Sequence, residues 1–354
     1  MMSATTSRHW ILAEKPTGMP VISGPPTTQA TFQLTTKPIP DLEEGQVLIK
    51  AQHISNDPAQ RLWIDPGIPA NRLYTKPVEV GETMKATIAV AEVVKSKAEI
   101  LPVGTLVTTI ASWSEYAVVA AEQCIPFRPV EGLSVTDCVA LFGFASVTAF
   151  YGLVDVANTG PNDAIVISGA AGAVGSVAVQ IAKHVLKCRK VIGIAGSDSK
   201  CKWVESLGAD VCLNYKSSGF KDELKQATDG FVEVFFDNVG GWILDLMLTL
   251  LQKEGRVIAC GAIANYNNNT PGVKNWYHVI AMRLQIKGFV VLDAIPTGRW
   301  NVIMDSLVKA YKEGKLRATE EGVTIVSAKF EDVPKIWMRL FDGQSTGKLL
   351  TQLV

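Results

Sequence analysis

Residues 167–183 read ISGAAGAVGSVAVQIAK, and this stretch predicts the fold of most of the chain. An apolar run, AIVI, leads into it, so a buried strand is expected to turn here into a helix. Gly169 allows the sharp turn, Gly172 removes a Cβ where a pyrophosphate must approach the backbone, and Gly175 lets the helix pack against the sheet. The first turn of such a helix offers N–H groups and a partial positive charge to phosphates.

A glycine pattern alone is weak evidence, and here its first glycine is replaced by Ala170, leaving A-x-G-x-x-G. The surrounding chain supports the interpretation, because strand-like and helix-like runs alternate from residue 136 onward. The expected strands are 164–169, 190–196, 211–215, 232–240, 256–261 and 285–291, and the expected helices are 137–157, 176–186, 199–208, 220–228 and 242–252. This alternation predicts an α/β fold with a doubly wound parallel sheet that helices cover on both faces.

The sequence before this region is mostly β. Short apolar runs separated by Pro and Gly turns favour a barrel-like or sandwich domain there. Near the C-terminus, an amphipathic helix over 301–316 precedes a strand–helix–strand pattern. We therefore predict a β domain over 1–136, a nucleotide-binding domain over 137–309, and a segment 310–354 that returns to the first domain.

Composition excludes several classes of protein. The chain has 354 residues, 47% apolar and 19% charged, with a formal net charge of zero, as is ordinary for a soluble protein of about two domains. No block of like charge predicts a nucleic-acid or anionic-membrane surface, and neither a signal peptide nor a transmembrane helix is predicted. The six cysteines form no CxxC pair, so we expect reduced thiols and a cytoplasmic protein.

The end of the strand 190–196 indicates which dinucleotide to expect. Sites that prefer NAD place an acidic side chain at this strand end, on the ribose 2′-hydroxyl. Here the strand ends at Gly196, followed by Ser197, which leaves room for a 2′-phosphate that Lys200 can neutralise. Asp198 opposes this interpretation, unless it caps the helix that starts here. We expect NADPH rather than NADH.

The chain offers poor ligands for a catalytic zinc, which needs three from Cys, His and carboxylates. His53 has no cysteine nearby, Cys124 is isolated, and neither a GHE triplet nor a four-cysteine lobe occurs. No metal site is expected.

A second stretch, CGAIANYNN at 260–268, ends another buried strand. Ligands of doubly wound sheets lie just beyond such carboxyl ends. Gly261 and Ala262 keep the backbone close to a flat ring, and Tyr266 is the candidate catalytic residue. A hydroxyl donor can stabilise the charge that develops on a carbonyl oxygen. The alternative is a tyrosine that only walls the pocket. We interpret the asparagines at 265–269 as the start of a lid.

Together these features resemble the zinc-independent medium-chain dehydrogenases/reductases, and among them the leukotriene B4 dehydrogenase / prostaglandin reductase / alkenal double-bond reductase group. The resemblance runs nearly end to end, through AAGAVGS at 170–176, FDNVGG at 236–241, CGAIANYN at 260–267, IKGFVV at 286–291 and GKLLTQLV at 347–354. It implies a GroES-like β-barrel-type domain and a Rossmann domain. It also implies a homodimer that uses NADPH to reduce the C=C bond of α,β-unsaturated aldehydes and ketones without a metal.

The resemblance also implies where ligands bind. The cofactor contacts would be Gly172, Ala173, Val174, Gly175, Gly196, Ser197, Lys200, Tyr215, Asn238, Cys260, Gly261, Ala262, Ile263, Tyr266, Phe289, Val290, Val291 and Ser345. The substrate pocket would contain Asn56, Tyr74, Tyr266 and Tyr277. The chain departs from the family in two places: DPAQR at 57–61 stands where the family often has DPYMR, and GQSTGK at 343–348 stands for G-x-N-x-G-K.

Other functions fit the same scaffold. A quinone reductase, an NADP-dependent ketone or hydroxyl dehydrogenase, and a tailoring enoyl reductase of secondary metabolism are the enzymatic alternatives. A catalytically idle NADPH-binding protein is the alternative from another class, since fold does not determine function.

Overall fold

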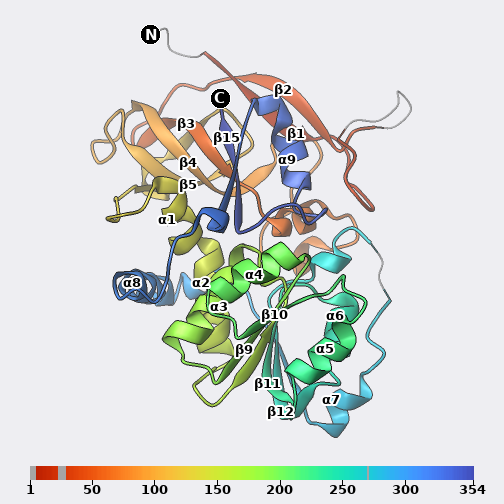
Figure 1. Cartoon of the computed structure of the whole chain (residues 1–354). Coiled ribbons are helices and arrows are strands. Elements are labelled where there is room, and N and C mark those ends of the chain that lie inside the picture. Colours follow the sequence, from red (N-terminus) through yellow and green to blue (C-terminus); the bar gives the residue numbers. More distant parts are fainter. Residues whose placement is uncertain (1–4, 23–28, 269–270) are drawn as a thin grey trace. The chain divides into compact units, whose positions relative to one another are not determined.

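Two compact units make up the protein in the computed structural model, which describes residues 5–22, 29–268 and 271–354 (Figure 1). Unit 1 comprises residues 1–135, 324–345 and 349–354, and unit 2 comprises residues 136–323 and 346–348. The chain therefore passes between the units four times, and the last two passages enclose only three residues.

Unit 2 is built on a six-stranded sheet in the order β10-β9-β8-β11-β12-β13, in which every neighbouring pair is parallel. The strands are β8 (Ala164–Ile167), β9 (Lys190–Ala195), β10 (Val211–Asn214), β11 (Val232–Asp237), β12 (Leu251–Ala259) and β13 (Gln285–Gly288). The chain runs outward from β8 to β10, then returns to β11 and runs outward on the other side. This confirms the predicted doubly wound parallel sheet, with its ligand crevice expected between β8 and β11.

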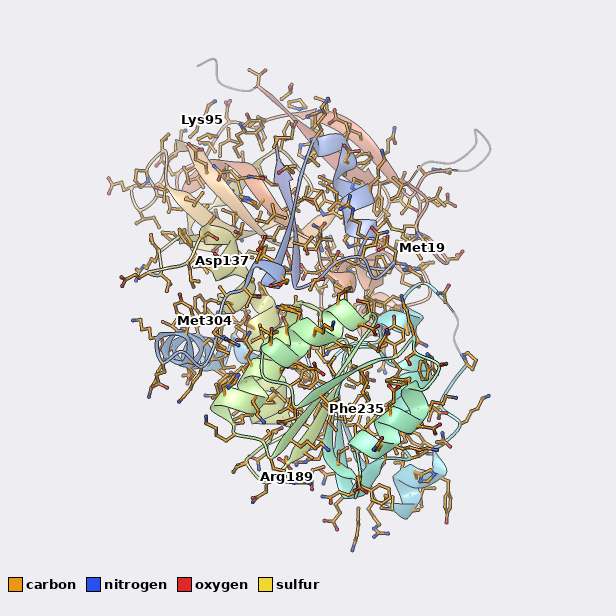
Figure 2. The ribbon with its side chains drawn as sticks, in the orientation of Figure 1. Met19, Lys95, Asp137, Arg189, Phe235 and Met304 are labelled. Carbon is orange, nitrogen blue, oxygen red and sulfur yellow. The ribbon has the colours of Figure 1, made fainter. Side chains whose placement is uncertain are left out.

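Helices connect and cover these strands. They are α1 (Val135–Phe142), α2 (Phe144–Phe150), α3 (Ala173–Gln180), α4 (Asp198–Ser206), α5 (Phe220–Ala227), α6 (Gly241–Met247), α7 (Tyr277–Ala281) and α8 (Arg299–Lys312). β8 is buried at every residue, which explains its continuous apolar sequence. Phe235 of β11 is fully buried in the core between sheet and helices, whereas Arg189 precedes β9 at the molecular surface (Figure 2).

The helical run over 135–156 comprises α1, α2 and a π-helical turn. No membrane helix was predicted from the sequence. This run is nevertheless long enough and apolar enough to cross a membrane, judged by length and composition only. However, 67% of its most apolar window is buried inside the protein. Burial of this extent is typical of a core helix.

The return to unit 1 comes at residue 324 rather than at the predicted 310. The ring of Tyr311 in α8 packs edge-on against Phe142 of α1, with centroids 6.0 Å apart. Beyond α8, the N–H of Arg317 donates to the side-chain oxygen of Gln180 in α3 at 2.8 Å. These contacts hold residues 310–323 on unit 2, because the apolar face of α8 is covered there.

Unit 1 contains a sheet in the order β14-β15-β3-β4-β5-β7, with β6 also paired to β3, and a separate sheet of β1 and β2. Its elements are β1 (Thr6–Leu12), β2 (Phe32–Pro38), β3 (Gln46–Ser55), β4 (Lys85–Ser96), β5 (Leu106–Ser112), β6 (Tyr116–Ala120), β7 (Cys124–Pro126), β14 (Val323–Ala328), α9 (Val333–Met338) and β15 (Lys348–Leu353). Trp113 and Trp337 are fully buried in its core, with rings 5.7 Å apart. The last strand, β15, therefore completes a sheet begun by the first fifth of the chain.

Candidate cofactor and active site

Three glycines shape the loop between β8 and α3. Gly169 has a φ of +59°, a left-handed conformation that favours glycine. A Cβ on Gly175 would overlap the carbonyl oxygen of Gly169 and lie 2.7 Å from the Cα of Ala170. α3 begins directly after Gly172, so the N–H groups of its first turn stand at the carboxyl edge of the sheet. The loop fits a dinucleotide pyrophosphate, because it combines a close backbone approach with the positive end of a helix.

Ala170 departs from the usual glycine, and its surroundings explain why. It is fully buried, and its N–H donates to the carbonyl of Ile194 in β9 at 2.9 Å. Its methyl carbon lies 3.2 Å from the place that a Cβ on Gly193 would take. The methyl group therefore faces β9, where Gly193 leaves the space for it.

Tyr215 and Gly196 meet at the end of β9, where the adenosine was predicted. The position of a Cβ on Gly196 would lie 3.1 Å from the Tyr215 ring and 3.2 Å from its hydroxyl oxygen. The ammonium of Lys216 lies 5.8 Å from the centre of the same ring. Sequence reasoning missed this second cation at the corner where Lys200 was expected to hold a 2′-phosphate.

Ser197, not Asp198, caps α4. The Oγ of Ser197 accepts the N–H of Lys200 at 3.3 Å, as a serine N-cap does. Asp198 is the first residue of the helix, and its carboxylate accepts from the side-chain amide of Asn214 at 2.8 Å. The carboxylate of Asp198 is thus held by β10, and Ser197 presents its hydroxyl at the strand end.

Asp237 joins the loops that follow β8 and β11. Its carboxylate accepts from the hydroxyl of Ser168 at 2.8 Å and from the N–H groups of Val239 and Gly240 at 3.0 Å each. Burial raises the pKa of this carboxyl above its ordinary value of 3.8, and the hydrogen bonds only partly oppose that rise. Asn238 next to it donates its side-chain amide to the Ser168 carbonyl at 2.7 Å. The predicted contact residue Asn238 is therefore fixed at the crevice between β8 and β11.

The same aspartate also holds the end of β12. Its backbone carbonyl accepts the N–H groups of Cys260 and Gly261, at 2.9 and 3.1 Å. Burial and the charge on Asp237 raise the pKa of Cys260 to about 12. A Cβ on Gly261 would lie 3.0 Å from the carbonyl oxygen of Asn238, so a glycine allows the two loops to touch.

Tyr266 folds back over the start of its own loop. The N–H of Ala262 donates to its hydroxyl oxygen at 3.3 Å, and a Cβ on Gly261 would lie 3.5 Å from the same oxygen. A short 3₁₀ turn over Ile263–Asn265 reverses the chain and makes this contact possible. Tyr266, Gly261 and Ala262 are therefore brought together, and their place at the nicotinamide end stays a prediction.

Phe289 to Val291 lie beyond the carboxyl end of β13, which stops at Gly288 instead of continuing to residue 291. The ring of Phe289 packs 5.9 Å from Tyr151 and 6.5 Å from Phe236. This packing holds the segment on the sheet, at the edge where the cofactor contacts are predicted.

The C-terminal segment contributes to the loop between β8 and α3, residues 168–172, which is the candidate pyrophosphate loop. The N–H of Gly347 donates to the carbonyl of Ala171 at 2.9 Å, and Gly347 forms an isolated parallel bridge with Gly172. Ser345, the predicted contact residue, stands two positions before Gly347 and has a buried hydroxyl oxygen.

Two family descriptions match the chain: "N-terminal domain of oxidoreductase" over residues 8–127 and "Zinc-binding dehydrogenase" over residues 173–309. The Bos taurus protein named "Prostaglandin reductase 1" is 32% identical, over 98% of this chain and 99% of its own length. The chain belongs to the zinc-independent medium-chain dehydrogenases/reductases of the prostaglandin reductase group. This confirms the family predicted from the motifs.

Two other proteins are similar to this chain over almost its full length. A Saccharomyces cerevisiae protein named "Uncharacterized membrane protein YML131W" is 33% identical over 98% of both chains. The crystal structure of CurA from Vibrio vulnificus in complex with NADPH matches with a TM-score of 0.85 and 28% identity, covering 98% of this chain and 99% of that one. Unit 1 is thus the GroES-like domain and unit 2 the Rossmann domain of the family fold, as predicted.

Residues of this reductase that were predicted to line the substrate pocket have different surroundings. Asn56 is 2% exposed, and its side-chain amide donates to the hydroxyl of Thr351 in β15 at 3.0 Å. Arg61, which follows in the same segment and was not predicted to line the pocket, is also buried, and it donates to the carbonyls of Pro16 and Gly18. Both side chains therefore hold unit 1 together. Tyr74, by contrast, is 42% exposed.

Tyr277 does not lie near Tyr266 within unit 2. It is 73% exposed and begins α7, whose C-terminal neighbour Met282 accepts the N–H of Glu254 at 2.7 Å. Glu254 lies in the first half of β12, whereas Tyr266 follows the carboxyl end of that strand. α7 therefore ends near the amino edge of the sheet, opposite the cofactor loops.

No three His, Cys, Asp or Glu side chains form a group that could hold a metal ion in residues 5–22, 29–268 and 271–354. The proposed lid at 265–269 lies partly outside the described residues, since Asn269 and Thr270 are not among them.

Proposed function

We propose that this enzyme uses NADPH to reduce the carbon–carbon double bond of α,β-unsaturated aldehydes and ketones. The observation that carries the proposal is the hydroxyl of Tyr266, which stands over Gly261 and Ala262 beyond the carboxyl end of β12. The match to NADPH-bound CurA supports the cofactor, and the name of the bovine relative supports double-bond reduction.

The Tyr266 hydroxyl is suited to the charge that such a reaction creates. NADPH supplies the hydride when bound. As the substrate's β-carbon accepts it, negative charge develops on the carbonyl oxygen, and a fixed O–H donor near that oxygen lowers the barrier. Tyr266 can also deliver the proton that converts the resulting enolate into the saturated carbonyl product. The N–H of Ala262, which donates to the Tyr266 oxygen at 3.3 Å, stabilises charge there as the proton leaves.

The corner at Gly196 supports NADPH over NADH. The strand end carries glycine and then Ser197, whose Oγ lies 3.0 Å from that of Ser199. Lys200 follows on the first turn of α4, and Lys216 lies beside Tyr215. Hydroxyls, a helix N-terminus and lysines suit a 2′-phosphate.

The test is NADPH oxidation by the purified protein against a panel of enals, enones, quinones and saturated ketones, and NADP⁺ reduction with alcohols, each with and without chelator. We expect turnover of enals and enones that chelator does not change. Turnover of quinones alone, or of saturated ketones or alcohols alone, would replace the proposal with one of those activities. NADPH binding without any turnover would indicate an idle binding protein.

We also propose that the enzyme is a homodimer joined through β13. All four residues of this edge strand are exposed, and Ile286 in it is 42% exposed. Ile280 and Trp276 nearby are 66% and 53% exposed. An edge strand of this kind pairs readily with the same strand of a second copy. Light scattering of the wild type should give a molar mass of two chains. The Ile286→Lys variant should lower the measured mass toward that of one chain. A wild type with the mass of one chain would contradict the proposal.

A further inference from the structure

The segment Thr346–Lys348 belongs to unit 2, although the chain on both sides of it belongs to unit 1. The N–H of Gly347 donates to the carbonyl of Ala171 at 2.9 Å, and the same glycine bridges to Gly172. These are the two residues that lead into α3. A chain segment more than 170 residues away in sequence therefore completes the pyrophosphate loop.

Gly347 is enclosed on its other side as well. Its φ is +61°, and a Cβ there would overlap the carbonyl oxygen of Gly322 and lie 2.6 Å from that of Glu321. Both obstacles are backbone, so no side-chain rotation relieves them. Gly347 is thus held between the pyrophosphate loop and residues 321–322, and only glycine fits.

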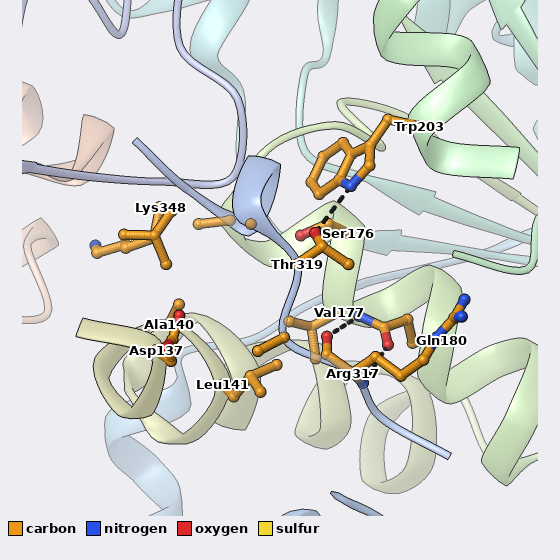
Figure 3. A pocket seen from close by; sticks show the side chains of 14 residues that line it. Asp137, Ala140, Leu141, Ser176, Val177, Gln180, Trp203, Arg317, Thr319 and Lys348 are labelled. Carbon is orange, nitrogen blue, oxygen red and sulfur yellow. Dashed lines mark hydrogen bonds between the residues drawn. The ribbon is translucent and has the colours of Figure 1, made fainter. Parts of the chain in front are cut away.

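A small cavity borders the same segment. Lys348, Gly322, Ala173 and Ser176 line it together with Trp203 and Thr319 (Figure 3). The indole N–H of Trp203 donates to the Thr319 hydroxyl at 3.0 Å and closes one side. The cavity, about 20 Å³, holds about one water, so the first turn of α3 and the segment share a space with little room for a shift of either.

The chain after Lys348 is fixed to unit 1 at once. The carbonyl of Leu349 accepts the N–H of Asn56 at 3.1 Å, and Leu350 pairs with Ser55 at the end of β3. The Asn56 side chain donates to Thr351 at 3.0 Å.

We propose that Gly347 is a positioning residue: it sets the shape of the loop between β8 and α3 that receives the pyrophosphate. The proposal rests on the proposed use of NADPH. Displacing the segment by about 1 Å, which an added methyl group requires, breaks the hydrogen bond to Ala171 and misplaces the loop that receives the pyrophosphate.

Gly347→Ala tests the proposal, and Gly343→Ala is its matched control. Both glycines have positive φ, of +61° and +69°, but a Cβ on Gly343 would meet nothing within 4 Å. Both variants therefore carry similar backbone strain, and only one carries the overlap. Titration with NADPH, followed by fluorescence, gives the dissociation constant and the number of sites per chain. We expect the constant to rise at least about tenfold for Gly347→Ala and to stay within about twofold for Gly343→Ala.

The number of sites distinguishes positioning from folding. A purely structural effect lowers the sites per chain while the remaining molecules bind normally, and that result would overturn the proposal. Equal dissociation constants in both variants would overturn it too. A wild type that does not bind NADPH would overturn the proposed function, and this inference with it.

Hydrogen exchange of the wild type gives a second measurement that needs no variant. On adding NADPH, we expect slower exchange in peptides covering 168–176 and also in those covering 346–348. Protection confined to 168–176 would overturn the proposal, even if NADPH binds tightly.

Discussion

Asp237→Ala tests whether the junction between β8 and β11 depends on one carboxylate. In the folded protein this side chain is 2% exposed and accepts from the hydroxyl of Ser168 and the N–H groups of Val239 and Gly240. Alanine leaves three donors without an acceptor, and the two buried ones, the Ser168 hydroxyl and the Gly240 N–H, cost about 1–3 kcal/mol each, or about 2–6 kcal/mol in sum. Because water can enter the vacated space, we expect a loss of about 3–4 kcal/mol in the free energy of unfolding.

The measurement is urea unfolding followed by tryptophan fluorescence and circular dichroism, with Asp237→Asn as the control. The asparagine can keep an oxygen at Oδ1, which carries all three contacts, and gives up Oδ2, which accepts only from Gly240 at 3.1 Å. We expect it to lose about 1 kcal/mol. If alanine costs no more than asparagine, the carboxylate does not hold the junction and the reasoning is wrong.

The difference in stability between the wild type and Asp237→Asn should depend on pH in a definite direction. Burial raises the pKa of Asp237 in the folded state above its ordinary value of 3.8. As pH rises from about 4 through the raised pKa, the folded state binds more protons than the unfolded state, so stability falls. Asp237→Asn lacks this loss, and the neighbouring Cys260 thiol stays protonated because its pKa is about 12. The stability advantage of the wild type over Asp237→Asn should therefore shrink with rising pH; a growing advantage contradicts the assignment.

Three further predictions concern the cofactor and substrate ends. Tyr266→Phe should lower kcat on an enone at least about tenfold at unchanged NADPH affinity, because it removes the donor to the carbonyl oxygen; an unchanged kcat would exclude Tyr266 from the chemistry. Lys200→Ala should raise KM for NADPH but not for NADH, and an intact preference for NADPH would refute the 2′-phosphate assignment. Cys260, with its pKa raised to about 12, should react with iodoacetamide far more slowly than a free thiol near pH 8; rapid alkylation, detected by mass spectrometry, would contradict the raised pKa.

Sequence reasoning predicted the parts of the site that depend on one short segment. The order of strands and helices in unit 2 follows from hydrophobic periodicity, and the loop at 169–175 follows from its glycines. The contact between Tyr266 and the start of its loop also lies within a few residues. The amphipathic helix α8 was also predicted from its own sequence. The sequence did not show what covers its apolar face, so the return to unit 1 was predicted at residue 310, whereas residues 310–323 stay on unit 2.

Long-range partners could not be predicted. FDNVGG was recognised as a motif, yet only Asn238 was taken from it, because nothing in the segment shows that Asp237 meets Ser168, a residue 69 positions earlier. Asn56 was predicted to lie in the substrate pocket, and in the structure its side-chain amide donates a hydrogen bond to the hydroxyl of Thr351. A polar residue at a strand end can face a ligand or another strand, and only the sheet order distinguishes the two.

By itself, then, the sequence determined the fold class, the glycine turn between β8 and α3 and the tyrosine loop beyond β12, because glycine conformations and hydrophobic periods act over a few neighbouring residues. The tertiary structure alone decided that Asp237 would tie β8, β11 and β12 together and that Gly347 would complete the loop at Ala171. The physical reason is that these contacts join residues which only the packing of the sheet brings within hydrogen-bond distance, and no local pattern encodes that packing.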